Sequence, residues 1–319
     1  TAVNLWFDNQ SDANATYGHI SDWNTSAVTN MTNAFKDRTS FNEDIGDWDV
    51  SNVTTFFHLF RNAISFNQDL SDWNTSSLVN MSRCFDGASS FNSDLSKWDI
   101  SNVNMMTAAF RNATSFNQNI NSWDVSNVLN IENLFYGASV FNQPIGDWNT
   151  SSVTNMISVF NNASAFNQPI ANWDTSSVTK MNRMFRDASD FNQDISDWNI
   201  SSANNMTIMF DGANNLSNRN KSKIHSSFSA NSNWYYDWSN FAPEDLQAVT
   251  NLEIVENKPA GSFVGEFNAS DPDDDQLNYQ VVQQLGSGQF APFYITQDGV
   301  LRTTRALDFE EAESYELTI

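Results

Sequence analysis

Hydrophobic and polar positions repeat along most of this chain with a fixed period of 25 residues. Eight tryptophans mark the period without insertion or deletion: Trp23, Trp48, Trp73, Trp98, Trp123, Trp148, Trp173 and Trp198. A phenylalanine recurs at the same spacing from Phe35 to Phe210, and a Phe-Asn pair recurs from Phe41 to Phe191. A constant period of this length indicates stacked repeats, which bury a continuous core only when several copies pack together.

Each repeat contains two shorter patterns. Trp48 and Val50 alternate with Asp47 and Asp49, which is typical of a short, half-buried strand. The apolar residues from Val53 to Ala63 then follow steps of three and four, which predict an outer helix that begins at Ser51. We therefore predict a right-handed α/β solenoid with parallel strands and helices on its outer wall. The Asn of each Phe-Asn pair is expected to form a ladder that bonds loop backbone groups.

The repeat pattern also predicts the domain boundaries. We expect an N-terminal cap at residues 1–18, eight turns at residues 19–216 and a C-terminal cap at residues 217–239. The C-terminal cap combines a helix that begins at Ser217 with the aromatic cluster from Trp234 to Trp238. Near Asn240 the repeat gives way to β-branched alternation with Gly-rich and Asp-rich turns. Residues 240–319 are therefore predicted to form a small all-β domain of about seven short strands.

The repeat resembles a known family. Its clearest copy runs from Trp173 through Asp174, Thr175 and Ser176 to Val178, and continues with Met181, Phe185, Ala188, Phe191 and Asn192. This motif resembles the BspA-like leucine-rich-repeat group of bacterial surface proteins. The resemblance covers residues 19–216 and implies a leucine-rich-repeat-like solenoid on a secreted or cell-surface protein. Adhesion and protein binding are the roles that it implies.

Residues 240–319 resemble a bacterial cadherin repeat. The resemblance rests on Val255-Glu256-Asn257, Asp271-Pro272-Asp273, Gly299-Val300-Leu301 and Leu307-Asp308-Phe309-Glu310. It implies a β-sandwich that holds Ca²⁺ at its poles, with Glu256, Asp308 and Glu310 at the C-terminal pole and Asp271 and Asp273 at the N-terminal one. The preceding segment, Asp237 to Phe241, keeps only one carboxylate of the family's linker. Because the family continues beyond the point that matches Ile319, we expect a truncated sandwich within a longer protein.

Composition restricts the classes of partner. The net charge of −23 argues against nucleic acid and anionic membrane surfaces. No apolar run is long enough to cross a membrane. The single cysteine, Cys84, occupies an apolar column and is expected to lie in the core. The three histidines share no repeat position, so we predict that the chain is not an enzyme. We expect a monomer within a longer extracellular or bacterial cell-surface protein.

Two columns of polar residues flank the tryptophans and form the candidate binding site. Its members are Asp22, Asp47 and Asp72 in one column, and Asn24, Asp49, Asn74, Asp99 and Asp124 in the other. They are expected to face away from the tryptophan core, on a concave sheet, and to bind a protein or glycan. Alternatively, the same side chains bond the adjoining turn before Ser51 and its copies.

Three functions are consistent with these patterns. The first is an adhesion segment, in which the solenoid recognises a ligand and the cadherin-like domain forms a stalk stiffened by Ca²⁺. The second is a purely structural spacer of a large surface protein. The third is a non-catalytic module of a secreted enzyme. The first and second functions differ in whether the solenoid binds a ligand. The third can be recognised from the identity of the neighbouring domains in the intact protein.

Overall fold

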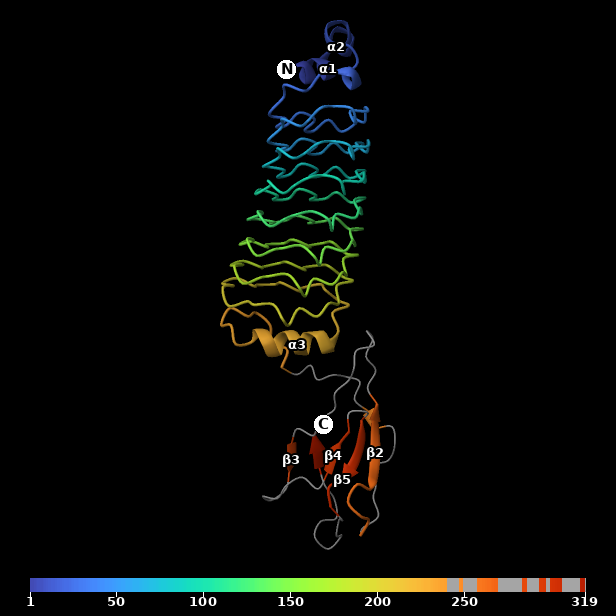
Figure 1. Cartoon of the computed structure of the whole chain (residues 1–319), viewed down its shortest axis with the longest axis vertical. Coiled ribbons are helices and arrows are strands. Elements are labelled where there is room, and N and C mark those ends of the chain that lie inside the picture. The colour runs from blue at the N-terminus through green and yellow to red at the C-terminus, as the bar shows by residue number, and fades with distance from the viewer. Residues whose placement is uncertain are drawn as a thin grey trace. The chain divides into compact units, whose positions relative to one another are not determined.

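The structure is a computed structural model that describes residues 1–239, 247–248, 257–268, 283–285, 293–296, 299–305 and 316–318. The chain divides into two compact units, Thr1–Ala242 and Pro243–Ile319. The first unit begins with helices α1 (Ala2–Asp8) and α2 (Gln10–Tyr17) and the short 3₁₀ helix η1 (Ile20–Asp22). A series of turns follows, and helix α3 (Asn218–Phe228) lies after the last of them (Figure 1).

Successive 25-residue turns lie one on the next (Figure 1). Each contributes one residue to a column of parallel β-bridges, which consists of Asn30, Thr55, Asn80, Met105, Asn130, Asn155, Lys180 and Asn205. The tryptophans from Trp48 to Trp198 are 2–5% exposed. Each of these indole N–H groups donates to a carbonyl of the preceding turn, as Trp98 does to Leu70 at 2.9 Å. The tryptophan column therefore combines apolar burial with a hydrogen bond at every turn.

The predicted outer helices are wrong. Residues 53–63 and their copies form consecutive tight turns without a helix. The reason is that two positions in each turn have a left-handed backbone, as at His58 (φ 58°) and Asn62 (φ 57°), whereas an α-helix needs right-handed values throughout. The N–H groups of His58 and Asn62 donate to the next turn, and that of Arg61 donates to the carbonyl of His58. The apolar residues still recur every three or four positions, because these are the positions whose side chains point inward from the turns.

The predicted strand at each tryptophan is also wrong. Residues 48–50 carry no strand pairing, and the parallel bridge instead falls five residues after Val50, at Thr55. Side chains join the turns beside the tryptophans, since the hydroxyl of Thr75 donates to the carbonyl of Asp99 at 2.9 Å. At Thr25, Thr75, Thr150 and Thr175 a side-chain hydroxyl thus replaces the backbone bond that a sheet would make, whereas the other turns have Val or Ile at this position. Cys84 is fully buried in the core, as expected.

The Phe-Asn pairs form the predicted ladder. The Oδ1 atom of Asn67 accepts the N–H of Asn92 at 2.8 Å, and each pair of neighbouring turns repeats this bond up to Ser217 and Asn192. The phenylalanines of these pairs stack on one another, as Phe91 and Phe116 do at 6.0 Å. Side-chain carbonyls therefore satisfy loop N–H groups that would otherwise lack a partner.

Both ends of the first unit carry aromatic caps. In α1, Trp6 packs against Trp23 at 6.0 Å and Phe7 packs against Phe41 at 5.6 Å. At the other end, Ser217 caps α3 by accepting the N–H of Asn220, as the sequence predicts. The rings of Trp234, Tyr236 and Trp238 then lie 5.4–6.3 Å from Phe210, in the last turn. These caps cover core faces that have no further turn to pack against.

The second unit contains two antiparallel sheets in the part that the structure describes. One has the order β1 (Gln247–Ala248), β2 (Phe263–Asn268), β5 (Val300–Thr303), β4 (Phe293–Ile295), and the other pairs β3 (Gln283–Leu285) with β6 (Glu316–Thr318). Val264, Phe293 and Leu301 form a small buried core. This arrangement is consistent with a β-sandwich.

Candidate functional site

The two polar columns beside the tryptophans are exposed to solvent, as the sequence predicts. We call the first the outer column; it consists of Asp22, Asp47, Asp72, Lys97, Ser122, Asp147, Asn172 and Asp197. We call the second the Asx column; it consists of Asn24, Asp49, Asn74, Asp99, Asp124, Asn149, Asp174 and Asn199. The buried tryptophan between the two members of each turn fixes their spacing. The eight candidate residues therefore share one surface.

Each member of the Asx column is held by the residue two positions later. The Oδ1 atom of Asp99 accepts the N–H of Ser101 at 3.0 Å and its hydroxyl at 2.7 Å. Asn74 makes the same two bonds to Ser76, at 3.1 and 2.8 Å. This is the bonding to the adjoining turn that the sequence left as an alternative. Ser51 and its copies therefore complete these turns instead of starting helices.

These bonds also keep the acidic members ionised. Hydrogen bonds from the hydroxyl and the N–H of Ser101 lower the pKa of Asp99, against a weaker opposing effect of burial. Equivalent serines lower the pKa values of Asp49, Asp124 and Asp174. Within residues 1–239, no hydrogen bond engages the Oδ2 atom of any of these four carboxylates. Each presents an oriented acceptor toward solvent, which suits hydrogen bonding to hydroxyls, amides or cations.

The outer column is less regular. Lys97 donates to Asp72 across the turn boundary at 2.8 Å, and this bond raises the pKa of Lys97. Both side chains are mostly exposed, so the pair adds little stability. Asp147 accepts a bond from the side-chain amide of Asn121 at 2.7 Å. Neutral and basic residues thus interrupt the carboxylates, which reduces repulsion along the column.

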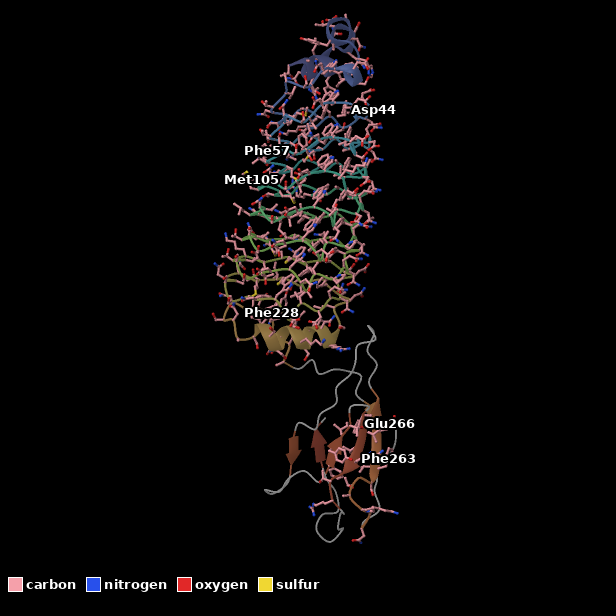
Figure 2. The ribbon with its side chains drawn as sticks, viewed as in Figure 1. Asp44, Phe57, Met105, Phe228, Phe263 and Glu266 are labelled. Carbon is pink, nitrogen blue, oxygen red and sulfur yellow. The ribbon has the colours of Figure 1, made fainter. Side chains whose placement is uncertain are left out.

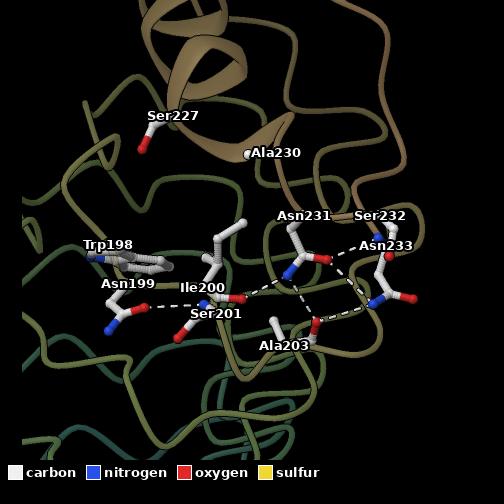
Figure 3. A pocket seen from close by; sticks show the side chains of 10 residues that line it. All are labelled: Trp198, Asn199, Ile200, Ser201, Ala203, Ser227, Ala230, Asn231, Ser232 and Asn233. Carbon is white, nitrogen blue, oxygen red and sulfur yellow. Dashed lines mark hydrogen bonds between the residues drawn. The ribbon is translucent and has the colours of Figure 1, made fainter.

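A polar hollow of about 620 Å³ lies where the Asx column ends (Figure 3). It is lined by Trp198, Asn199, Ile200, Ser201, Ala203, Ser227, Ala230, Asn231, Ser232 and Asn233. Asn231 crosses it and donates to the carbonyls of Ile200 and Ala203 at 2.7 and 3.1 Å. The hollow therefore carries amides and hydroxyls but no charged side chain. The sequence did not predict it, because it forms between the last turn and the loop after α3.

The five residues that match cadherin calcium ligands, Glu256, Asp271, Asp273, Asp308 and Glu310, lie outside the described residues. In the described part of the chain, no group of three His, Cys, Asp or Glu side chains is placed to hold a metal ion. Nor does any helix of that part have the length and apolar character needed to cross a membrane.

The acidic edge and the apolar edge of the first unit are distinct. Figure 2 shows Asp44 on one edge of the turns and Phe57 and Met105 on the opposite one. Met105 is 50% exposed and Leu129, one turn further on, is 52% exposed. The Asx bonds recur on the acidic edge, where Asp44 accepts the N–H of Gly46 at 3.0 Å. The same bond recurs in the column of Met105, where the Oδ1 atoms of Asn80 and Asn130 accept N–H groups at 2.9 and 2.8 Å, so such acceptors lie on both edges.

Comparison with known proteins assigns the two parts to families. Residues 1–123 and 104–224 match the family described as Mycoplasma protein of unknown function, DUF285. Together these matches cover more than half of the chain, which therefore belongs to this family. Residues 250–319 match the cadherin domain. The chain thus combines a repeat unit of an uncharacterised family with a domain type that is usually extracellular and generally binds Ca²⁺.

The curated relatives match the cadherin part. Protocadherin Fat 4 of Mus musculus is 42% identical over 69 residues, which are 21% of this chain and 1% of that protein. Protocadherin alpha-2 of Pan troglodytes is 37% identical over 82 residues, or 24% of this chain and 8% of that protein. Protocadherin alpha-13 of Homo sapiens is 33% identical over 87 residues, which are 26% of this chain and 9% of that protein. The chain thus spans only a small part of these relatives. No solved structure matches it.

Proposed function

We propose that this chain is a recognition segment of an extracellular, cell-surface adhesion protein. In this proposal the stacked turns form a solenoid that binds a protein or glycan, and the cadherin-like unit is a Ca²⁺-binding stalk. The chain binds rather than catalyses, and it acts as a monomer within a longer protein. The cadherin match supports the adhesive and extracellular parts of this proposal.

The regular presentation of free carboxylate oxygens carries the proposal. Asp49, Asp99 and Asp124 each use Oδ1 to bond a serine, and each side chain is nevertheless exposed. A side chain that is already fixed loses little conformational freedom when a ligand binds. The amides of Asn24 and Asn74 alternate with these carboxylates and add donors as well as acceptors. This combination suits sugar hydroxyls and peptide amides.

The calcium part of the proposal rests on the cadherin match and on ligand chemistry. Ca²⁺ prefers six to eight oxygen ligands, mostly from carboxylates. Glu256, Asp308 and Glu310 would supply them at one pole, and Asp271 and Asp273 at the other. The three protocadherins and this chain share the domain type, which generally binds Ca²⁺.

The binding part can be tested with a variant that leaves the turns intact. Asp49→Asn, Asp99→Asn and Asp124→Asn together remove three charges but keep Oδ1, and asparagine already makes these bonds at Asn24, Asn74 and Asn149. We expect an unchanged unfolding midpoint and at least about tenfold weaker capture on arrays of glycans and extracellular-matrix peptides.

The matched control removes three charges from a neighbouring column. Asp44, Asp69 and Asp94 also accept an N–H two residues later, so their triple change to asparagine alters net charge equally. We expect it to retain capture. Equal losses in both variants would indicate attraction by net charge alone and would contradict a site at the Asx column.

A structural spacer is the second candidate, and the bonds between turns favour it. Every turn is tied to the next through backbone, indole and side-chain amide groups, so the unit is well suited to hold two domains apart. If neither the chain nor its variants binds any glycan or peptide on the arrays, a structural spacer becomes the favoured function in place of an adhesion segment. A non-catalytic module of a secreted enzyme remains the third candidate, and the domains beside this segment in the intact protein distinguish it.

A further inference from the structure

Along residues 31–37, 56–62 and their copies, the backbone bonds between turns run in one direction. N–H groups at alternate positions of one turn donate to carbonyls at alternate positions of the next. His58, Phe60 and Asn62 donate to Ser82, Cys84 and Asp86 at 3.2, 2.8 and 2.7 Å. In this segment, each turn therefore has a donor edge toward the C-terminal end of the stack and an acceptor edge toward the N-terminal end.

The carbonyls on the acceptor edge of the first turn have no backbone N–H donor within residues 1–239. Within residues 1–239, no N–H group donates to the carbonyls of Thr32, Ala34 or Lys36. In all seven later turns the corresponding carbonyls accept a backbone N–H, as Phe57, Leu59 and Arg61 do. The N–H groups that bond the copies of these carbonyls are also two residues apart, as those of His58, Phe60 and Asn62 are, and they belong to segments with the same tight turns.

Apolar side chains beside this edge are also less covered than their copies. Trp23, Val28 and Ala34 are only partly buried. Their copies in the next turn, Trp48, Val53 and Leu59, are at most 5% exposed. Helix α1 covers the aromatic side of the first turn through Trp6 and Phe7. It lies beside residues 28–34 but leaves Val28 and Ala34 only partly buried.

A groove of about 700 Å³ results. We call it the N-terminal groove; it is lined by Thr1, Ala2, Val3, Asn4, Tyr17, Trp23, Asn24, Thr25, Val28, Asn30, Met31, Thr32, Asn33, Ala34 and Trp48. No charged side chain lines it. Its floor thus combines apolar side chains with a row of backbone acceptors, which is the chemistry of an exposed sheet edge.

We propose that the N-terminal groove binds a peptide segment that adopts the turn conformation of the repeat and lies on the first turn as each turn lies on the next. The peptide donates N–H groups of alternate residues to Thr32, Ala34 and Lys36, and places an apolar side chain against Val28. The seven later interfaces show what such a segment looks like, since each is formed by a stretch such as Met181 to Asp187. A saccharide fits less well, because sugar hydroxyls do not recur at the main-chain spacing.

A synthetic peptide with the sequence of residues 178–190 is the probe. In the chain, Phe185 donates its N–H to Met209 at 2.8 Å, whereas the N–H of Asn182 has no acceptor within residues 1–239. We expect the peptide to shift amide resonances of residues 28–36 of the full chain. N-methylation at Phe185 should weaken binding by about tenfold, because the bond and the close approach are both lost. N-methylation at Asn182 is the matched control and should change binding by less than about threefold.

A change in the chain tests the same contact. Val28→Asp places a charge in the groove, whereas Thr29→Asp adds the same charge at an exposed neighbouring position. We expect the first to abolish peptide binding and the second to preserve it, in chains whose tryptophan fluorescence shows that both are folded. Equal binding by the two N-methylated peptides, resonance shifts elsewhere on the chain, or saturation of the groove by a neutral oligosaccharide in place of the peptide would overturn the proposal.

Discussion

At the scale of single residues, one pairing explains most of the acidic surface of the repeats. Asp99 and its copies are exposed, yet each is fixed by a serine two positions later. The bond serves the turn through one oxygen and leaves the other oriented toward solvent. A structural role and a binding role can therefore reside in the same side chain, and the Asp-to-Asn change separates them because asparagine preserves only the structural role.

The first prediction concerns the pKa of Asp99. Ser101→Ala should raise it, because the serine hydroxyl is the largest cause of its depression. A depressed folded-state pKa stabilises the protein above the ordinary value near 3.8, and that stability is lost as the pH falls through the folded value. The variant should therefore be less stable than the parent at neutral pH and approach it in stronger acid.

A carboxyl-carbon NMR titration of Asp99 measures this change directly. Ser176→Ala is the control, because it removes the same hydroxyl three turns away, beside Asp174. It should leave the titration of Asp99 unchanged. A pKa of Asp99 that is the same with and without the Ser101 hydroxyl would contradict the assigned cause.

At the scale of elements, the left-handed positions decide the backbone. They form two columns, represented in the second turn by His58 and Asn62. The second column contains only Asp, Asn and Gly: Asp37, Asn62, Gly87, Asn112, Gly137, Asn162, Asp187 and Gly212. These are the residue types that tolerate a left-handed backbone. Their recurrence before Ala63 and its copies was the signal in the sequence against a helix.

The second prediction tests that column at Asn162, which has a φ of 59° and an exposed side chain. Asn162→Val should destabilise the first unit by about 1–2 kcal/mol, because a β-branched residue disfavours this conformation. Asn162→Gly is the control and should be nearly neutral, since Gly137 occupies the same position one turn earlier. Urea unfolding monitored by tryptophan fluorescence measures both variants, and equal stability of the two would argue against backbone strain as the determinant.

At the scale of the whole molecule, the chain joins two units with different sources of stability. The first unit has one continuous core that extends from Trp6 to Trp238. The second unit has a separate core around Leu301. Residues 240–319 contain 15 acidic and 3 basic residues, so like charges are close in sequence there. A cation that binds only the folded state would stabilise that unit by mass action.

The third prediction is a calcium-dependent unfolding transition for the second unit alone. At a free Ca²⁺ concentration a hundred times the dissociation constant, its stability should rise by about 2.7 kcal/mol. The transition of the first unit should not move. Calorimetry with Ca²⁺ and with chelator measures both transitions, and Asp308→Asn with Glu310→Gln should reduce the response by removing ligands of one pole. Identical transitions with and without chelator would contradict the calcium site and indicate that the second unit is an acidic β domain that binds no Ca²⁺.

The sequence by itself determined the period, the buried tryptophan column, the polar columns beside it and the change of fold near residue 240. These follow from side-chain type at fixed spacing, because burial sorts apolar from polar positions whatever the backbone does. The Phe-Asn ladder was also predictable, since a small amide at a constant position can bond its own copy one turn away.

Only the tertiary structure decided how the backbone connects these positions. Steps of three and four fitted both a helix and consecutive tight turns, and contacts between turns determined which one formed, because N–H groups at Phe60 and Asn62 bond the next turn instead of their own. The hollow beside Asn231 and the N-terminal groove beside Val28 arise where a cap meets a turn. The sequence predicted a cap at each of these places, but it did not show which backbone groups and side chains of the end turns the cap leaves uncovered.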